Sequence, residues 1–318
     1  MTLQRFFPKR LIVFSRDEMK QWDMQKEFDS FDRKKALRYF IGDVRDRDRL
    51  NLAFQDVDYV IHAAATKIVP TAEYNPFEAV KTNVLGAMNV IEAAIAQKVK
   101  KVIALSTDKA CNPINLYGAT KLCSDKLFIA GNAYAGKHDF RFSVVRYGNV
   151  MGSRGSMIPF FVAMARTGVI PLTDERMTRF MITLEQAVAM VWTALHDCVG
   201  GEIYVPKIPS MKVLDIAKAV SNGAKIKIIG IRPGEKLHEL LISEDDARST
   251  YEYDTYYKIL PTIYDWHESV KRIGRGKKCP CHFGYSSSNN LWRMTRQGLL
   301  RWLKQEYGNC DPVRASAH

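Results

Sequence analysis

The chain has 318 residues, of which 47% are hydrophobic, and its formal net charge is +13 at pH 7. This length and composition suit a globular protein with a sizeable core and one large or two modest domains. The sequence has neither an apolar run of ~18 residues nor a secretory signal, so we expect a cytoplasmic protein without membrane spans.

The basic charge allows three interpretations: a substrate and cofactor that carry diphosphates, nucleic acid, or a solvated basic surface. The Lys and Arg residues are spread out without interleaved aromatic residues, so we expect no nucleic-acid partner. The six cysteines show no disulfide-like spacing, which is typical of a reducing compartment. Cys279, Cys281 and His282 form a cluster without a second ligand pair at zinc-finger spacing, and we predict no metal site.

Five short apolar runs, rich in β-branched residues, recur with room for a helix between them. Such runs are typical of strands that are buried on both faces of a parallel sheet. We predict strands at residues 11–14, 37–41, 59–64, 102–105 and 142–147.

Helical patterns lie between these strands. Asn75 and Pro76 offer an N-cap and a first-turn proline to a long helix whose apolar residues fall on one face as far as Ala94. A second helix begins near Tyr117. This alternation predicts an α/β fold with a doubly wound parallel sheet, which binds ligands at the carboxyl ends of its strands.

After about residue 150 the pattern becomes turn-rich and mixed. We predict a nucleotide-binding Rossmann core in residues 1–150, joined by a late helix at 183–198. Residues 151–318 are expected to form mainly a smaller substrate-binding region and a C-terminal extension.

The strongest pattern of reactive residues is Tyr117 and Lys121, which follow the predicted strand 102–105. Residues four apart share one face of a helix, so the Lys121 ammonium can lower the pKa of the Tyr117 phenol. A phenol with a lowered pKa serves as a base near neutral pH. The alternative is an ordinary surface pair of residues.

Asp108 and Lys109 lie at the end of the same strand, directly after Thr107. An adjacent acid and amine can supply both an acid and a base within one sugar ring if their surroundings move their pKa values toward neutrality. The alternative is a surface ion pair. At the end of the first predicted strand, Ser15 and Arg16 suit the 2′-phosphate of NADP, because an arginine there accepts that phosphate.

Long stretches of the chain resemble the inverting UDP-N-acetylglucosamine 4,6-dehydratases, which are extended short-chain dehydrogenase/reductases. The resemblance runs from Lys9 onward. The retaining relatives typically carry Met at the position of Tyr117, which favours the inverting branch. The matching stretches are STDKACNPINLYGATKLCSDKLF (106–128), SVVRYGNVMGSRGS (143–156), LTDERMTRFMITLEQ (172–186), GGEIYVPKIPSMK (200–212) and IGIRPGEKLHE (229–239).

The resemblance implies a redox-neutral dehydration of UDP-N-acetylglucosamine with inversion at C5, in the making of a surface sugar such as pseudaminic acid. NADP+ would remove hydride from C4 and return it to C6. Tyr117, supported by Lys121, would take the C4 hydroxyl proton, and Thr107 would hydrogen-bond the C4 oxygen. Lys109 would abstract the C5 proton and Asp108 would protonate the departing C6 hydroxyl.

The resemblance also implies binding residues and a homo-oligomer. For the cofactor they are Ser15, Arg16, Asp43, Val44, Ala64, Lys67, Asn83, Tyr117 and Lys121. For the UDP-sugar they are Lys67, Asn149, Arg154, Thr173, Arg179, Arg232 and Glu235. Ile68 departs from the family, where His is usual, and this is expected to alter sugar contacts.

The family opens with a strand, a Gly-rich turn and a helix, which do not fit into the ten residues before Leu11. That strand normally lies in the centre of the sheet, so we expect two strands with unpaired backbone groups. The chain as written should then bind NADP weakly, and a mis-assigned start or a truncated gene is the simplest explanation. The alternatives to the inverting dehydratase are a retaining dehydratase, an epimerase, or an inactive remnant that binds UDP-sugar.

Overall fold

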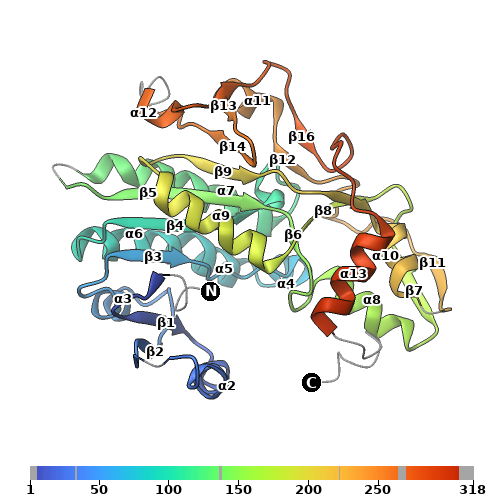
Figure 1. Cartoon of the computed structure of the whole chain (residues 1–318), viewed down its shortest axis with the longest axis horizontal. Coiled ribbons are helices and arrows are strands. Elements are labelled where there is room, and N and C mark those ends of the chain that lie inside the picture. The colour runs from blue at the N-terminus through green and yellow to red at the C-terminus, as the bar shows by residue number, and fades with distance from the viewer. Residues whose placement is uncertain (1–5, 33, 136–137, 222, 264–269, 308–318) are drawn as a thin grey trace.

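The main sheet of the protein is built mostly from parallel strands. The computed structural model describes residues 6–32, 34–135, 138–221, 223–263 and 270–307. Within these residues the sheet has the strand order β15-β13-β14-β9-β5-β4-β3 (Figure 1). The strands are β3 (Tyr59–His62), β4 (Lys101–Thr107), β5 (Arg141–Tyr147), β9 (Ile203–Pro206), β13 (Thr250–Glu252), β14 (Tyr256–Ile259) and β15 (Lys277–Lys278).

The predicted parallel core is confirmed for β3, β4 and β5, and β9, which was not predicted, joins β5 in parallel. Strands β14, β13 and β15 extend this core in antiparallel fashion. They were not predicted, because runs of two to four residues are too short to show a period in the sequence.

Strands β1 (Leu11–Ser15) and β2 (Leu37–Ile41) pair in parallel and form a sheet of their own. Among the described residues β1 pairs only with β2, and β3 pairs only with β4. The expectation of two strands with unpaired edges is therefore confirmed. An unpaired edge leaves a row of backbone donors and acceptors without a strand partner.

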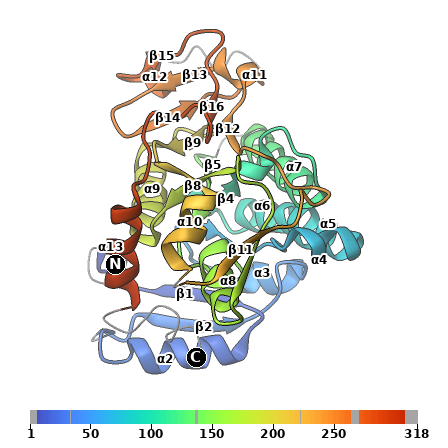
Figure 2. The ribbon, with the colours of Figure 1, turned by 90° about the vertical axis from the view of Figure 1, so that its right-hand side faces the viewer.

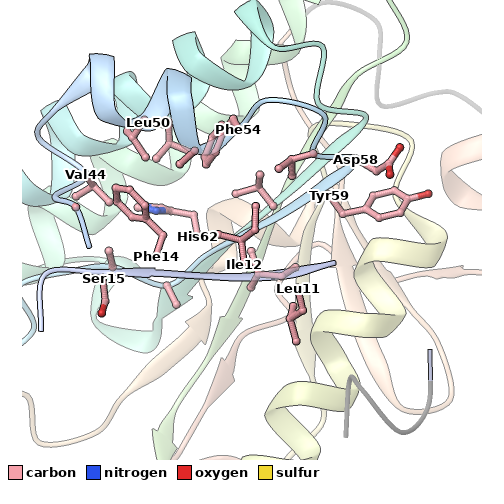
Figure 3. A pocket seen from close by; sticks show the side chains of 18 of the residues that line it. Leu11, Ile12, Phe14, Ser15, Val44, Leu50, Phe54, Asp58, Tyr59 and His62 are labelled. Atoms are coloured by element: carbon pink, nitrogen blue, oxygen red, sulfur yellow. The ribbon is translucent and has the colours of Figure 1, made fainter. Parts of the chain in front are cut away.

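A cavity of about 1850 Å³ lies between β1 and β3. Figure 3 shows Ile12 and Phe14 pointing from β1 toward Leu50 and Phe54, with His62 of β3 beside Phe14. The chain segments that follow β1, β2 and β3 all line this cavity. The cavity thus reaches from an apolar interior to the carboxyl ends of the strands.

Helices cover the sheets on both faces. The long helix expected after residue 75 consists of α5 (Pro76–Val80), a π-helical turn η1 (Lys81–Leu85) and α6 (Gly86–Ala96). Asn75 makes no capping hydrogen bond from its side chain, and its Nδ2 instead donates to the Thr71 carbonyl oxygen at 3.1 Å. The other helices of this part are α2 (Glu18–Phe28), α3 (Arg47–Ala53), α4 (Val69–Tyr74), the 3₁₀ turn η2 (Asp108–Ala110), α7 (Leu116–Gly131), the 3₁₀ turn η3 (Asn132–Ala135) and α9 (Leu184–Asp197).

A second apolar cluster lies on the side where the parallel strands end (Figures 1 and 2). Met151, Ile158, Leu172, Ile216 and Leu299 are among its buried residues. Around it are β6 (Asn149–Val150), α8 (Met157–Ala165), β7 (Val169–Leu172), β8 (Thr178–Ile182), β10 (Ser210–Lys212), α10 (Val213–Val220), β11 (Lys225–Ile228) and α13 (Arg296–Tyr307).

The remaining elements are β12 (Leu240–Ile242), α11 (Glu244–Ala247), α12 (Val270–Ile273) and β16 (Tyr285–Ser286). In the described part of the chain no helix combines the length and apolar character needed to cross a bilayer. The same residues contain no group of three or more His, Cys, Asp or Glu side chains arranged to hold a metal ion.

Candidate active site

The end of β4 carries three of the predicted catalytic residues. Asp108 is completely buried, and Lys109 Nζ donates to Asp108 Oδ1 at 3.0 Å. Thr107 caps the short turn η2, since its hydroxyl oxygen accepts from the Lys109 backbone N–H at 3.3 Å. The strand end therefore places a hydroxyl, a carboxylate and an ammonium group together.

Helix α7 brings Tyr117 and Lys121 to this strand end. Asn115 caps the helix by accepting from the Gly118 N–H at 2.8 Å, which puts Tyr117 in the first turn. Gly118 allows the close approach, because a Cβ at this position would lie 2.1 Å from the carbonyl oxygen of Lys109. The structure thus places Tyr117 beside Thr107, Asp108 and Lys109 of the strand end, with Lys121 about one helical turn further along α7.

The charge that acts on Tyr117 differs from the predicted one. Burial raises the pKa of Tyr117, and it is Lys109, with the Thr107 hydroxyl, that opposes this rise. Burial also lowers the pKa of Lys121, although Asp125 opposes that shift. The prediction that Lys121 lowers the pKa of the phenol is wrong for this structure, because desolvation outweighs the nearby charges.

Asp108 and Lys109 share their site with a second carboxylate, that of Glu239. Lys109 Nζ lies 3.4 Å from Glu239 Oε1. Burial raises the pKa of Asp108 even though Lys109 opposes the shift. Burial alone would lower the pKa of Lys109, but Asp108 and Glu239 raise it above its ordinary value. The ammonium is therefore the stable form of Lys109 in this structure.

Arg179 does not take the predicted position of a free diphosphate ligand. One terminal nitrogen donates to the carbonyl oxygens of Thr178 and Leu237, at 2.8 and 3.1 Å. The other donates to the Lys236 carbonyl oxygen at 3.0 Å, and Nε lies 3.6 Å from Glu239 Oε1. The guanidinium is held by these protein groups, so a phosphate would have to displace them.

The predicted cofactor residues divide into two groups. Five of them line the cavity at the carboxyl ends of β1, β2 and β3: Ser15, Arg16, Asp43, Val44 and Ala64. The Arg16 side chain is 60% exposed, and with the described residues it forms only a long ion pair of 3.5 Å, to Asp43. Its guanidinium is thus open to an anionic ligand.

The second group lies outside the lining of this cavity and includes Asn83, whose side-chain amide is bonded to protein groups at both ends. Its Oδ1 accepts from the Thr66 N–H at 2.8 Å, and its Nδ2 donates to the Thr66 carbonyl oxygen and to the Thr120 hydroxyl, both at 3.0 Å. These bonds fasten the loop after β3 to α7, and the contact of Asn83 with the cofactor stays a prediction. Lys67, in that loop, is exposed to solvent. Partial desolvation by its neighbours, with a contribution from Lys20, lowers the pKa of its ammonium.

The residues present fit a nicotinamide dinucleotide at both of its ends. Lys121 is 3% exposed, and in the described part of the chain its ammonium forms no hydrogen bond. This ammonium would suit a ribose hydroxyl beside Tyr117. Arg16 is open to a 2′-phosphate at the other end. After β1 the chain reads Ser15-Arg16-Asp17 rather than a glycine turn.

The other predicted substrate residues differ in burial. Asn149 Oδ1 and Glu235 Oε2 are buried, and neither has a hydrogen-bond partner in the described part of the chain. Arg154 and Arg232 are exposed, and Thr173 is half-buried after β7. A buried oxygen without a partner is costly unless a ligand supplies a donor, so Asn149 and Glu235 fit a bound polar molecule best.

Two residues of the site, Glu239 and Asp125, were not identified from the sequence. Glu239 ends the matching stretch 229–239, but no spacing rule connects it with Lys109, which lies 130 positions earlier. Asp125 continues the Tyr117 and Lys121 stripe by another four residues, and it accepts from the Ser106 hydroxyl at 2.7 Å. That helical spacing could have revealed it.

Comparison with known proteins agrees with this geometry. Residues 1–261 match the family described as polysaccharide biosynthesis protein. A UDP-N-acetylglucosamine 4,6-dehydratase (inverting) of Campylobacter jejuni is 54% identical over 305 residues, which are 93% of this chain and 90% of the relative. A UDP-glucose 4-epimerase of Rickettsia canadensis is 43% identical over 286 residues, which are 88% and 83% of the two chains.

A solved structure shares both fold and sequence with this chain. The X-ray structure of Pen from Bacillus thuringiensis superposes with a TM-score of 0.85 and 38% identity, covering 94% of this chain and 90% of its own. The strand-end constellation, the sheet order and these similarities lead to one conclusion: the chain belongs to the polysaccharide biosynthesis protein family of extended short-chain dehydrogenase/reductases, together with the inverting UDP-N-acetylglucosamine 4,6-dehydratases.

Proposed function

We propose that this protein is an NADP-dependent 4,6-dehydratase that converts UDP-N-acetylglucosamine into a UDP-4-keto-6-deoxy sugar with inversion at C5. The observation that carries this proposal is the buried pair of Asp108 and Lys109 beside Tyr117. A dehydration needs both an acid for the leaving hydroxyl and a base for the C5 proton. Asp108 can supply the acid and Lys109 the base, and one hydrogen bond joins the two groups.

The first proton to be removed from the sugar is that of the C4 hydroxyl. When bound, the nicotinamide would accept hydride from C4 and return it to C6. Tyr117 is the base for the C4 hydroxyl proton, with Thr107 positioned to hold the C4 oxygen. Burial raises the pKa of Tyr117, so its phenol is protonated in this structure and has to ionise before turnover. The positive charge of Lys109 favours that ionisation.

Elimination uses one proton shared within the pair. The Lys109 ammonium passes its proton along the 3.0 Å hydrogen bond to Asp108, which leaves a neutral amine and a carboxylic acid. The amine then takes the C5 proton, which the C4 ketone has made acidic. The Asp108 acid protonates the C6 hydroxyl, which leaves as water. The pair ends as ammonium and carboxylate, as it began. Once the hydride has returned to C6, C5 takes a proton from solvent on the opposite face, and Tyr117 releases to solvent the proton that it took from the C4 hydroxyl.

The UDP-sugar is proposed to lie under the loop of residues 232–236. Lys236 Nζ donates to the Cys111 carbonyl oxygen at 2.6 Å, which fixes this loop above η2. Glu235 and Asn149 offer oxygens without partners to the sugar or uridine. Arg154 and Arg232, with Lys67 and Thr173, are the proposed diphosphate and uridine contacts, because exposed guanidinium groups bind phosphate oxygens in a bidentate manner.

The proposal also covers the oligomeric state, the cellular compartment and the pathway of the product. Large apolar side chains are exposed along α4, α5, η1 and α6: Tyr74, Phe77, Val80, Leu85 and Met88. A patch of this kind favours a homo-oligomer. Among the described residues the cysteines are free thiols, which favours the cytoplasm, and the product would enter a surface sugar such as pseudaminic acid.

Two other functions have a specific observation behind them. Relatives named UDP-glucose 4-epimerase are 43% identical, but an epimerase needs neither a C5 base nor a C6 acid. A protein that binds UDP-sugar without turnover is favoured by the cavity that separates β1 from β3. A retaining dehydratase would use the same pair and return the C5 proton to the original face.

One experiment separates all of these. The protein is incubated with UDP-N-acetylglucosamine in D₂O, with and without NADP+, and products are followed by proton NMR. The proposed function predicts a 4-keto-6-deoxy product with deuterium at C5 and inverted configuration. A C4 epimer, a retained C5 centre, or binding by calorimetry without any product would each replace it with the corresponding alternative.

A further inference from the structure

The Glu239 carboxylate lies at the centre of the catalytic charges although it has no assigned part in the reaction. It is 2% exposed. Its Oε1 lies 3.4 Å from Lys109 Nζ and 3.6 Å from Arg179 Nε. Its Oε2 is buried and has no hydrogen-bond partner among the residues that the structure describes. A buried carboxylate with one free oxygen is costly unless that oxygen serves a ligand or a moving group.

The backbone of Glu239 is fixed from both sides. Its N–H donates to the Ser287 hydroxyl at 2.9 Å, and its carbonyl oxygen accepts from the Ser287 N–H at 2.8 Å. The Ser287 hydroxyl also contacts the Thr178 hydroxyl at 2.7 Å. Arg179 adds two further bonds from its guanidinium to the preceding turn. The position of the carboxylate is therefore set by a rigid, buried frame.

The groups that face Lys109 come from four elements. Asp108 precedes it in η2, Glu239 precedes β12, Arg179 lies in β8 and Tyr117 in α7. Lys236 adds a positive charge near Glu239. Two carboxylates thus compete for a proton that leaves Lys109.

The surroundings push these two carboxylates in opposite directions. Burial would raise the pKa of Glu239, but Lys109, Arg179 and Lys236 lower it. The pKa of Asp108 is raised by burial, with a further rise from Glu239. Pairs of titratable groups whose pKa values are driven apart divide acid and base roles between them.

We propose that Glu239 is a positioning residue that holds the Lys109 amine in place and remains ionised, so that Asp108 is the carboxyl group that carries the shared proton. This inference rests on the proposed dehydration. Glu239 also stabilises the ammonium that re-forms when Lys109 has taken the C5 proton. No atom of Glu239 is gained or lost in the reaction.

The test uses Glu239→Gln, which keeps the shape and removes the charge, and Glu239→Asp, which keeps the charge. Glu202→Gln is the matched control: Glu202 is equally buried and pairs with Arg272 at 3.5 Å, away from Lys109. For Glu239→Gln we expect kcat to fall between ~10- and 100-fold with KM nearly unchanged. Glu239→Asp should recover part of this loss, and Glu202→Gln should keep kcat.

The pH profile distinguishes positioning from a purely structural effect. Loss of the negative charge removes a contribution that raises the pKa of both Asp108 and Lys109. Both limbs of the kcat profile should therefore move to lower pH in Glu239→Gln and stay in place in Glu202→Gln. Limbs that coincide in these two variants would overturn the inference.

A second readout does not depend on turnover. Lysine is labelled with ¹³C at Cε, the Lys109 resonance is assigned by its loss in Lys109→Arg, and its titration is followed by NMR without ligand. In Glu239→Gln this resonance should titrate at lower pH than in the unaltered protein. An unchanged titration refutes the inference, whereas absence of a 4-keto product from the unaltered protein refutes only the proposed dehydration.

Discussion

The side-chain amide of Asn115 donates a 2.8 Å hydrogen bond to the carbonyl oxygen of Gly234. The same side chain caps α7 by accepting from the Gly118 N–H. One residue therefore joins the helix that carries Tyr117 to the loop that carries Glu235. The Oδ1 of Asn115 caps the helix, and its Nδ2 holds the proposed substrate loop.

Substitutions of Asn115 should separate these two tasks. Asn115→Asp keeps the capping oxygen and loses the donor, so we expect a stability within ~0.5 kcal/mol of the unaltered protein but a higher KM for UDP-N-acetylglucosamine. Asn115→Ala should also lose ~1 kcal/mol of stability. Urea unfolding and steady-state kinetics measure the two effects. Equal KM values for Asn115→Asp and the unaltered protein would contradict the proposed loop contact.

Gly118→Ala tests how closely α7 must approach the catalytic strand end. Alanine favours a helix, but its Cβ would meet the Lys109 carbonyl oxygen at 2.1 Å, so backbone has to move. We expect a loss of ~1 to 3 kcal/mol in the free energy of unfolding and a large fall in kcat. Gly298→Ala, where the nearest atom is the Thr295 hydroxyl oxygen at 3.3 Å, is the control. Unaltered kcat in Gly118→Ala would show that this close approach is unnecessary.

Lys109→Met tests the base proposed for C5. Methionine has similar length but cannot carry a proton, so elimination should stop while the substrate is still oxidised at C4. This oxidation should be slower, because Tyr117 loses the positive charge that favours its ionisation. The near-ultraviolet absorbance of reduced nicotinamide should then rise without a 4-keto-6-deoxy product. Lys100→Met removes only an exposed ion pair with Asp58 and should keep full activity. Full turnover by Lys109→Met would eliminate the proposed role.

The first five strands along the chain were predicted from local sequence signals, whereas their order in the sheet was not. Apolar runs located β1 to β5, and the spacing of Tyr117 and Lys121 predicted that both belong to one face of α7. Glu239 could not be found in this way, because its proximity to Lys109 depends on how β12 docks against η2. The direction of the Tyr117 pKa shift also depends on burial, which one helical spacing does not reveal.

His62 should make stability depend on acid pH. The side chain is buried, and within the described ranges its Nε2 has no hydrogen-bond partner. Burial, with a contribution from Lys121, lowers the pKa of His62 to about 3. The unfolded chain binds a proton near pH 6.5 while the folded state does not. The free energy of unfolding should therefore fall as the pH drops from about 6.5 toward 3.

Between pH 7 and pH 5 this single group accounts for ~2 kcal/mol. His62→Leu removes the titration, so its stability should change less over this interval than that of the unaltered protein. Urea unfolding at several pH values measures the difference. His138→Leu serves as the control, since His138 is exposed. Parallel pH dependences in His62→Leu and the unaltered protein would show that His62 is protonated in the folded state.

The separation of β1 from β3 should be visible in amide hydrogen exchange. Strand β4 has partners on both sides, β3 and β5, so its backbone groups open only when a large part of the sheet opens. Strand β1 pairs only with β2 among the described residues, and its other edge faces the cavity. We expect amides of residues 11–15 to exchange at least ~10-fold faster than those of 101–107. Mass spectrometry of peptides from the two strands measures this ratio. Equal protection of the two strands would contradict this prediction. It would mean that the free edge of β1 is hydrogen-bonded in solution to a group other than β3.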